Sequence, residues 1–338
     1  MANIKLANSD IAFTCDEDDT IMRAAVRAGL GFPYECNVGS CGNCRFELVE
    51  GAVEHDRQDS PAYNERDKQR NRWLGCQAKP NSDCQIKVRL SDHYVSRFAP
   101  QKTPGTVTEI FDITHDIREF RFKLDRPARF LPGQYALLYV PHVTGARAYS
   151  MCNVTRDGAE WHFQIKKVPD GKATTQLFDA IKVGSAIEFD GPFGMAYLRE
   201  DAPRDVLCLA GGSGLSPMVS IARGFAEAEG LKGRQLHFVY GGRRVQDVCG
   251  EDALKGLPGW GERIHYYPVI SMPDKDPDAA SWTGKTGLIT DVAKEMFGDS
   301  MRDFEIYFAG PPAMARAVMQ IMMELKVPPA QIHFDEFY

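Results

Sequence analysis

Four cysteines with uneven spacing constrain the fold of this chain more than any other feature. Three of them, Cys36, Cys41 and Cys44, lie close together in the stretch YECNVGSCGNC (34–44). The fourth, Cys76, follows in WLGCQAKP. Glycine, serine and asparagine fill the short loop, and glycine tolerates the positive φ angles that a tight backbone wrap requires. The spacing therefore predicts a loop that folds around a group held by four thiolates.

Two kinds of metal centre use four thiolates. A C-x4-C-x2-C run followed by a distant cysteine is the arrangement of plant-type [2Fe–2S] clusters. Structural zinc is the alternative, but zinc sites usually pair their ligands in two short C-x2–4-C turns. One loop with three thiols and a lone fourth cysteine favours the iron–sulfur cluster. The remaining cysteines lie apart and are expected to be small buried side chains: Cys15, Cys84, Cys152, Cys208 and Cys249.

Composition narrows the class of protein. The chain has 338 residues, enough for two or three domains of roughly 100–150 residues each. A net charge of −6, with no Lys/Arg-rich run in the sequence, argues against nucleic-acid binding. The sequence has no apolar run of about 20 residues to span a membrane, and its N-terminus lacks the apolar core of a signal peptide. We therefore expect a cytosolic protein.

The residues around the cysteines predict a small α+β domain. NIKLANSDIAFTC (3–15) alternates around an Asn-Ser-Asp turn and predicts a hairpin. DEDDTIMRAAVRAGLG (16–31) predicts a helix with acidic residues at its positive end and a stop at Gly29. Residues 1–95 resemble a plant-type ferredoxin, a small β-grasp domain, in the four cysteines and in FPYEC and GCQAKP.

The segment after this domain predicts a linker and then a small antiparallel barrel. SDHYVSRFAPQKTP (91–104) lacks periodicity and ends in proline, as linkers do. Alternating segments separated by turn residues follow, with one short helix near 174–181. The predicted strands are TVTEIFDIT, REFRFKL, QYALLYV, WHFQIKKV and SAIEFDGPFG.

Two motifs in the barrel region point to a phosphate-containing ligand. In RAYS (147–150), an arginine that can bind a pyrophosphate shares one extended segment with a tyrosine and a serine. In GKAT (171–174), backbone N–H groups open the short helix and can bind phosphate. Ordinary strand packing, and a glycine turn with Thr174 as N-cap, are the alternatives.

These two motifs, in this order, resemble the flavin domain of the ferredoxin–NADP⁺ reductase superfamily. The resemblance implies an antiparallel Greek-key barrel that binds FAD, with Ser150 beside the flavin N5. It assigns FAD binding to Arg147, Ala148, Tyr149, Ser150, Gly171, Lys172, Ala173 and Thr174.

The last third of the chain changes to alternating strands and helices. Strands are predicted in DVLCLAG, LHFVYGG, IHYYPVIS and FEIYFAG, so the region should form a doubly wound parallel sheet. Ligands bind such sheets at the carboxyl ends of the strands. GGSGLSPM together with AGPPAM resembles the nucleotide domain of the same superfamily, although Ala309 stands where that family usually has cysteine. The resemblance implies a nucleotide site made by Gly211, Gly212, Ser213, Gly214 and Pro217 on one wall and by Gly310, Pro311 and Met314 on the other.

The choice between NADH and NADPH rests on YGGRRVQDV (240–248). Arg243 and Arg244 are possible partners for the 2′-phosphate of NADPH, whereas Asp247 is suited to the free ribose hydroxyls of NADH. The pattern resembles NADH-using members and predicts NADH. The chain ends in HFDEFY, where the resemblance implies that Phe337 covers the flavin, with Asp335 as its acidic partner. Tyr338 in that role, or an aromatic tail packed in the core, is the alternative.

The order of domains predicts an electron-transfer protein with a ferredoxin at 1–95, a flavin barrel at 103–200 and a nucleotide domain at 203–338. It resembles the reductase components of bacterial multicomponent oxygenases of the benzoate-dioxygenase and toluene- and phenol-monooxygenase types. The resemblance implies electron flow from NADH through FAD and the [2Fe–2S] cluster to an oxygenase or hydroxylase component, or to a Rieske-type ferredoxin, of an aromatic-hydrocarbon system. It also implies catalytic roles for Ser150, Phe337 and Asp335. A sugar-deoxygenating dehydratase as acceptor, and a redox sensor without turnover, are the alternatives.

Overall fold

The structure is a computed structural model, and it describes residues 1–7 and 9–336, without the side chains of residues 335 and 336. Two compact units make up the chain. The first contains Met1–Pro104, Ala136–Ala148 and Ile187–Phe193, and the second contains Gly105–Tyr135, Tyr149–Ala186 and Gly194–Tyr338. The units therefore do not follow the order of the sequence.

The N-terminal part of the first unit is a β-grasp fold, as predicted. Five strands form one sheet in the order β2-β1-β7-β3-β5. The N-terminal hairpin pairs β1 with β2 in antiparallel fashion, and β1 runs parallel to β7. The strands are β1 (Ala2–Leu6), β2 (Ala12–Cys15), β3 (Arg45–Glu50), β5 (Arg72–Leu74) and β7 (Cys84–Lys87). A second small sheet contains β4 (Val53–His55) and β6 (Ala78–Pro80), and the helices are α1 (Ile21–Arg27) and α2 (Glu65–Gln69).

Helix α1 starts differently from the prediction. Its N-cap is Thr20, and its first turn contains no acidic residue. Asp19 lies just before the helix, and its carboxylate binds the guanidinium of Arg27 in the last turn at 2.8 Å. The acidic run therefore lies at the N-terminal end of the helix, as predicted, but it precedes the N-cap, and none of its residues is in the first turn. The predicted stop is confirmed, since Gly29 follows the helix with a φ of +78°.

The middle of the chain supplies a six-stranded sheet in the order β11-β10-β13-β8-β9-β12. Antiparallel pairing joins β9 to both β8 and β12. The strands are β8 (Gln101–Asp112), β9 (Ile117–Leu124), β10 (Tyr135–Tyr139), β11 (Arg147–Ser150), β12 (Glu160–Lys166) and β13 (Ala186–Phe193), and the helix is α3 (Lys172–Asp179). All predicted strands are present. The predicted linker 91–104 is not wholly irregular, because it holds a 3-10 turn at Asp92–Tyr94 and the start of β8.

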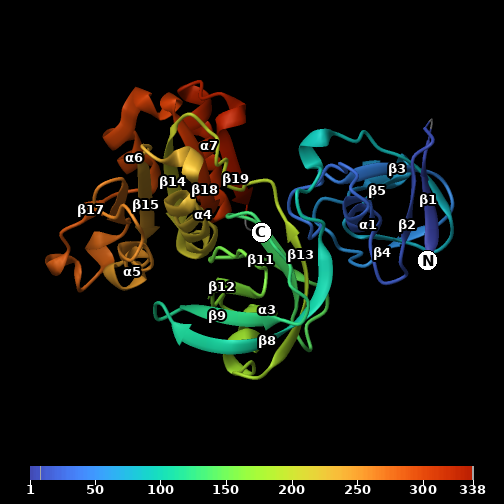
Figure 1. The fold of residues 1–338 in the computed structure, drawn as a ribbon, viewed down its shortest axis with the longest axis horizontal. Coiled ribbons are helices and arrows are strands. Elements are labelled where there is room, and N and C mark those ends of the chain that lie inside the picture. Colours follow the sequence, from blue (N-terminus) through green and yellow to red (C-terminus); the bar gives the residue numbers. More distant parts are fainter. Residues whose placement is uncertain (8, 337–338) are drawn as a thin grey trace. The chain divides into compact units, whose positions relative to one another are not determined.

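The last part of the chain is a parallel sheet in the order β17-β16-β15-β14-β18-β19 (Figure 1). Its strands are β14 (Asp205–Gly211), β15 (Leu236–Gly242), β16 (Ile264–Ile270), β17 (Lys285–Thr286), β18 (Phe304–Gly310) and β19 (Ile332–Glu336). The connecting helices are α4 (Leu215–Glu227), α5 (Glu251–Lys255), α6 (Ile289–Phe297) and α7 (Pro312–Glu324). The sequence analysis predicted neither β17 nor β19.

Helices cover both faces of this sheet. Alternate residues of the central strand β14 point to opposite faces, so the helix that each residue contacts shows which face that helix covers. Val206 and Cys208 of β14 pack in one buried cluster with Phe225 of α4. Leu207 of β14 packs in a second cluster with Val318 of α7, and α6 contributes to that cluster too. The predicted doubly wound arrangement is confirmed.

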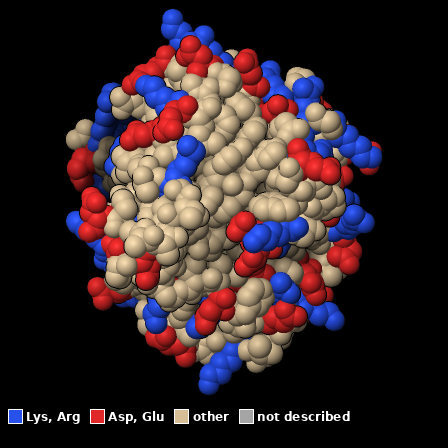
Figure 2. All heavy atoms as spheres, turned by 90° about the vertical axis from the view of Figure 1, so that its left-hand side faces the viewer, with Lys and Arg blue, Asp and Glu red and all other residues tan. Residues whose placement is uncertain are grey.

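The surface shows no sign of a polyanion-binding face in the view of Figure 2. Basic and acidic side chains are interspersed on that face, around areas without charge. Among the described residues, no helix is both long enough and apolar enough to cross a membrane.

Candidate functional site

The structure brings the four cysteines of the predicted cluster together as two pairs. The backbone N–H of Cys41 donates to the Sγ of Cys36 at 3.3 Å, and that of Cys76 donates to the Sγ of Cys44 at 3.5 Å. The Ser40 N–H also donates to the Sγ of Cys36, at 3.3 Å. All four thiols are free of disulfides.

The spacing of the sulfur atoms fits two irons better than one zinc. Tetrahedral zinc with bonds of about 2.3 Å holds all four sulfurs about 3.8 Å from one another. Among the described residues, no three of these sulfurs lie within 4.8 Å of one another. Two pairs of thiols are what a cluster of two irons requires, with one pair on each iron.

Positive φ angles allow the cluster loop to curl. Gly39 and Gly42 have φ angles of +81° and +80°, and Asn37 has a φ of 55°. A Cβ on Gly39 would lie 2.7 Å from the Oγ of Ser60, and one on Gly42 would overlap the guanidinium of Arg45. The positive φ angles therefore favour glycine at these two positions, as the sequence suggested, and a larger residue would also displace the side chains of Ser60 and Arg45.

The environments of the two thiol pairs differ. Cys44 and Cys76 are buried, whereas Cys36 and Cys41 are half-buried. The pKa of Cys36 is lowered, because the Cys41 thiol donates a hydrogen bond to its sulfur and nearby backbone N–H groups add to the effect, and the pKa of Cys41 is raised by the same hydrogen bond.

Two arginines that the sequence analysis did not single out hold this loop. The guanidinium of Arg23 donates to the carbonyl oxygens of Asn37 and Cys76 at 3.3 and 3.2 Å. The guanidinium of Arg45 donates to the carbonyl oxygen of Gly42 at 2.8 Å. Neither residue belongs to the cysteine motif, so the sequence offered no signal for these contacts.

The RAYS motif forms β11, with its ends in different environments. Arg147 is exposed, and its guanidinium donates to backbone carbonyls of residues 144–146. Ser150 is buried, and its Oγ has no hydrogen-bond partner among the described residues. A buried hydroxyl without a partner is costly, so this hydroxyl fits a bound group that offers a polar atom. The backbone carbonyl of Ser150 accepts from the Oγ of Ser216 in α4 at 2.6 Å.

The second flavin motif opens α3. Gly171 is the N-cap of that helix, with no side chain capping the helix start. The alternative with Thr174 as N-cap was wrong, because Thr174 lies inside the first turn and its Oγ1 accepts the Val168 N–H at 3.1 Å. A Cβ on Gly171 would lie 2.6 Å from that Oγ1. The first N–H groups of α3, from Lys172 and Ala173, are therefore left for a phosphate.

The predicted nucleotide-binding glycines meet at the carboxyl ends of β14 and β18. These strands run parallel, with Ala210 beside Ala309. A Cβ on Gly214 would overlap the carbonyl oxygen of Ala309, and a Cβ on Gly211 or Gly310 would lie 2.6 or 2.7 Å from the Sδ of Met314. Backbones approach this closely only where side chains are absent.

The remaining predicted nucleotide residues flank this edge. Gly212 has a φ of +55° and begins a 3-10 turn, Gly212–Gly214, that includes Ser213 and leads into α4. Pro217 is buried in the first turn of α4, and Pro311 is the N-cap of α7. The two walls implied by the resemblance therefore lie side by side in one unit.

Cys249 is an exception among the five isolated cysteines. The other four are buried, as expected, but Cys249 is half-buried. Its thiol donates to the Tyr240 hydroxyl at 3.3 Å, and that hydroxyl donates to the carbonyl oxygen of Gly212 at 3.3 Å. Cys249 thus supports the glycine turn through Tyr240.

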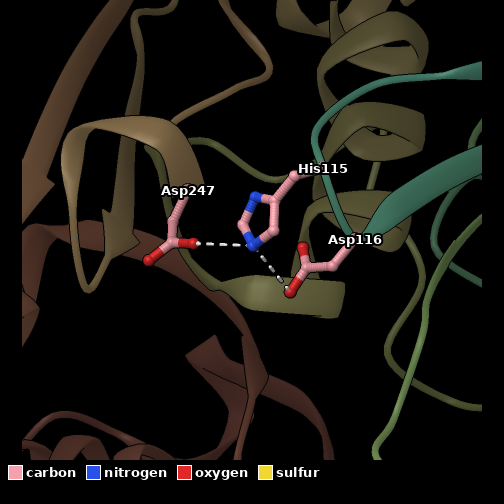
Figure 3. A group of neighbouring side chains, drawn as sticks. All are labelled: His115, Asp116 and Asp247. Atoms are coloured by element: carbon pink, nitrogen blue, oxygen red, sulfur yellow. Dashed lines mark ion pairs between the residues drawn. The ribbon is translucent and has the colours of Figure 1, made fainter.

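Asp247 lies at the carboxyl end of β15, where the sequence placed the choice of coenzyme. Its carboxylate accepts the backbone N–H groups of Arg243 and Arg244 at 3.2 and 2.9 Å. Both arginine side chains are exposed. His115 points towards Asp247 and Asp116, with its Nε2 3.7 and 3.6 Å from their carboxylates (Figure 3). The Nζ of Lys166 also binds Asp116, at 2.7 Å. No motif in the sequence indicated that His115 joins this group.

The predicted C-terminal residues are only partly described. Strand β19 pairs in parallel with β18, so that the backbone of Asp335 lies beside Ala309. The side chain of Asp335, and Phe337 and Tyr338 as a whole, lie outside the described residues. The register places the backbone of Glu336 beside Gly310, at the edge where the nucleotide glycines lie.

Comparisons with known proteins agree with this geometry. Residues 4–81 match the 2Fe-2S iron-sulfur cluster binding domain, residues 104–197 the oxidoreductase FAD-binding domain and residues 208–320 the oxidoreductase NAD-binding domain. The chain is 35% identical to ferredoxin–NAD(P)(+) reductase CarAd of Metapseudomonas resinovorans, over 96% of each chain. The chain belongs to the family of ferredoxin–NAD(P)⁺ reductases.

Other members of the family serve oxygenase systems. The chain is 34% identical to the ferredoxin–NAD(+) reductase component of the alkene monooxygenase system of Xanthobacter autotrophicus, over 98% of this chain and 99% of that protein. The solved structure of the ferredoxin reductase in carbazole 1,9a-dioxygenase matches with a TM-score of 0.91 and 32% identity, over 100% of this chain and 98% of that one.

The family membership confirms the predicted set of cofactors. The protein is an oxidoreductase with domains for a [2Fe–2S] cluster, FAD and NAD, and these three groups form one electron-transfer chain. Zinc in the four-cysteine site is not supported. A redox sensor without turnover and a dehydratase reductase are not favoured, since the relatives named here are reductases of oxygenase systems.

Proposed function

We propose that this chain takes hydride from NADH and delivers single electrons to the oxygenase component of an aromatic-hydrocarbon oxygenase system. The observation that carries the proposal is that the sites for all three cofactors occur in one chain. They are the half-buried thiols of Cys36 and Cys41, the buried Ser150 hydroxyl without a partner among the described residues, and the glycines at the ends of β14 and β18. Bound FAD supplies the chemistry that links a two-electron donor to a one-electron cluster. The residues of the chain bind, orient and tune the cofactors.

The flavin is held by residues of β11 and α3. Arg147 is available to a pyrophosphate, since its described hydrogen bonds go to backbone carbonyls rather than to a carboxylate. The open start of α3, Gly171 to Thr174, serves a phosphate. The resemblance also assigns flavin contacts to Ala148 and Tyr149. The hydroxyl of Ser150, unpartnered among the described residues, would donate a hydrogen bond to bound flavin, and this bond would compensate for its burial.

The nicotinamide nucleotide binds at the ends of β14 and β18. The 3-10 turn Gly212–Gly214 lets the pyrophosphate approach the backbone, and Pro217 shapes the start of α4. Gly310, Pro311 and Met314 form the opposite wall. Asp247 favours NADH by accepting hydrogen bonds from ribose hydroxyls, and Arg243 lines the adenosine end. The resemblance assigns to Phe337, with Asp335 as its acidic partner, the role of covering the flavin until NADH binds, and Phe337 and the Asp335 side chain lie outside the described residues.

Electrons leave through the more exposed half of the cluster loop. Cys36 and Cys41 are half-buried while Cys44 and Cys76 are buried, so a docked partner approaches closest to the first pair. The acceptor is an oxygenase or hydroxylase component or a Rieske-type ferredoxin. The names of the carbazole, alkene and naphthalene relatives support an oxygenase system. The cytosolic location expected from the sequence stays a prediction.

Anaerobic spectroscopy of the purified holoprotein tests the proposal. A flavin band and sulfide-to-iron absorption should both bleach on addition of NADH, and NADPH should act at least tenfold less efficiently. NADH-driven reduction of cytochrome c distinguishes an enzyme from a sensor. Reconstitution with an oxygenase component then tests the acceptor. Bleaching without any NADH-dependent turnover of such a component would refute the assigned acceptor and leave the electron chain intact.

A further inference from the structure

We propose that Arg23 is a positioning residue for the cluster, a buried cation that holds the cluster loop and raises the reduction potential of the [2Fe–2S] centre. Arg23 lies in α1, outside the cysteine motif and outside every predicted binding motif. The residue is 5% exposed, although arginine is almost never fully buried unless it is paired.

Every hydrogen bond of the buried guanidinium goes to a neutral group. Its Nε donates to the Oδ1 of Asn37 at 2.9 Å, and its Nη2 donates to the carbonyl oxygens of Asn37 and Cys76. Its Nη1 donates to the hydroxyl of Tyr139 in β10 at 3.2 Å. Asn37 follows the ligand Cys36, and Cys76 is itself a ligand, so one side chain binds the backbone at both ends of the ligand set.

The charge of Arg23 is not neutralised by a neighbour. Among the described residues, no carboxylate lies within ion-pair distance of it, and the nearest acids, Asp19 and Asp190, both bind Arg27. Arginine stays protonated in proteins, so a full positive charge sits in the interior beside the loop.

A buried cation at this place favours the reduced cluster. Two irons, two sulfides and four thiolates carry a net negative charge, and reduction adds one electron and no proton. The negative charge therefore grows by one unit on reduction, and a cation that is screened little by water stabilises the product more than the reactant. Burial and hydrogen bonds to ligands are recognised means of setting the potential of such clusters.

Arg45 provides an internal comparison. Its guanidinium also binds a carbonyl of the cluster loop, but its Nε is 3.1 Å from the carboxylate of Asp67, and its side chain is 32% exposed. A paired and partly solvated cation has little net effect on a neighbouring charge. Both arginines therefore bind backbone carbonyls of the cluster loop, but among the described residues only the charge of Arg45 is paired with a carboxylate.

Redox titration of the holoprotein, followed by the EPR signal of the reduced cluster, tests the assignment. We expect Arg23→Gln to lower the ratio of reduced to oxidised cluster at a fixed potential tenfold or more, which is a shift of about 59 mV for a one-electron couple. Arg23→Lys keeps the charge, and Arg45→Gln removes a compensated charge. Both should change the ratio less than threefold. Tyr139→Phe, which removes one hydrogen bond and no charge, should also change it less than threefold.

Three results would overturn the proposal. One is a cluster-loaded Arg23→Gln protein whose ratio changes less than threefold. The second is an Arg23→Lys protein whose ratio falls tenfold, which would assign the effect to geometry instead of charge. The third is an Arg45→Gln protein that shifts as much as Arg23→Gln. If Arg23→Gln does not retain its cluster, Arg23→Met, which also removes the charge, takes its place in the titration, and a change of less than threefold in its ratio overturns the proposal. Flavin reduction by NADH should stay unchanged in every variant.

Discussion

Replacement of Gly214 by alanine tests the geometry of the nucleotide edge. An added Cβ would overlap the carbonyl oxygen of Ala309 and lie 3.0 Å from the backbone nitrogen of Gly310. Both obstacles are backbone atoms, which cannot turn aside as a flexible side chain can, so the cost belongs at the upper end of overpacking, about 3 kcal/mol. Gly214 is the N-cap of α4, a position at which alanine is less favourable than glycine, so helix propensity does not offset this cost. The loss is therefore about 3 kcal/mol.

The loss should appear where the ends of β14 and β18 bind the nucleotide. The overlap is relieved only when the two strand ends move apart, so NADH should bind more weakly, by at most roughly 150-fold for about 3 kcal/mol, measured as KM in NADH-driven ferricyanide reduction, which draws electrons from the flavin. Gly241→Ala, at the end of the neighbouring strand β15, is the matched control, because its Cβ would meet nothing closer than 3.4 Å. Equal KM values for the two variants would refute the close approach of the two strand ends.

The other predictions concern the first unit. Cys76→Ser should abolish cluster-dependent cytochrome c reduction while NADH still bleaches the flavin, so retained reduction would refute the ligand set. Burial lowers the pKa of His55 from 6.5 to about 4, so the unfolded chain binds a proton that the folded chain does not. Stability should fall by about 3 kcal/mol as pH drops through this range, and His55→Gln should flatten the dependence of the urea midpoint on pH. Arg27→Met leaves the carboxylate of Asp190, which is 0% exposed, without its partner. It should lower the free energy of unfolding by about 3–5 kcal/mol, and an unchanged urea midpoint would contradict the pair's burial.

Features with a local chemical cause could be predicted from the sequence. The cluster ligands follow from the spacing of four cysteines, and the strand edges follow from runs of apolar residues that end in glycine. A close contact with the backbone of Ala309 requires glycine at position 214, and this glycine belongs to the GGSG motif from which the nucleotide site was predicted. Strand β17, only two residues long, and strand β19, at the very end of the chain, were missed because neither shows a period of its own.

Contacts between distant segments could not be predicted in this way. His115 and Asp247 lie within ion-pair distance, although they are far apart in the sequence. Neither turn contains a sequence motif that predicts its contact with the other. The same holds for Arg27 and Asp190, which are 163 positions apart. Long polar side chains are common on helix surfaces, so their partners become evident only when the fold brings the segments together.

Helix α1 explains why the compact units do not follow the sequence. Arg23 and Arg27 are four residues apart and so project from one face of the helix. Arg23 binds Tyr139 and Arg27 binds both oxygens of Asp190, which lie in the two later segments grouped with the N-terminal residues. A buried ion pair is costly to break, because the remaining charge has no water to solvate it. The face of α1 that carries the cation beside the cluster loop is therefore also the face that fixes strands β10 and β13. A change that alters the potential of the cluster through Arg23 should leave this attachment in place, since Arg27 maintains it independently.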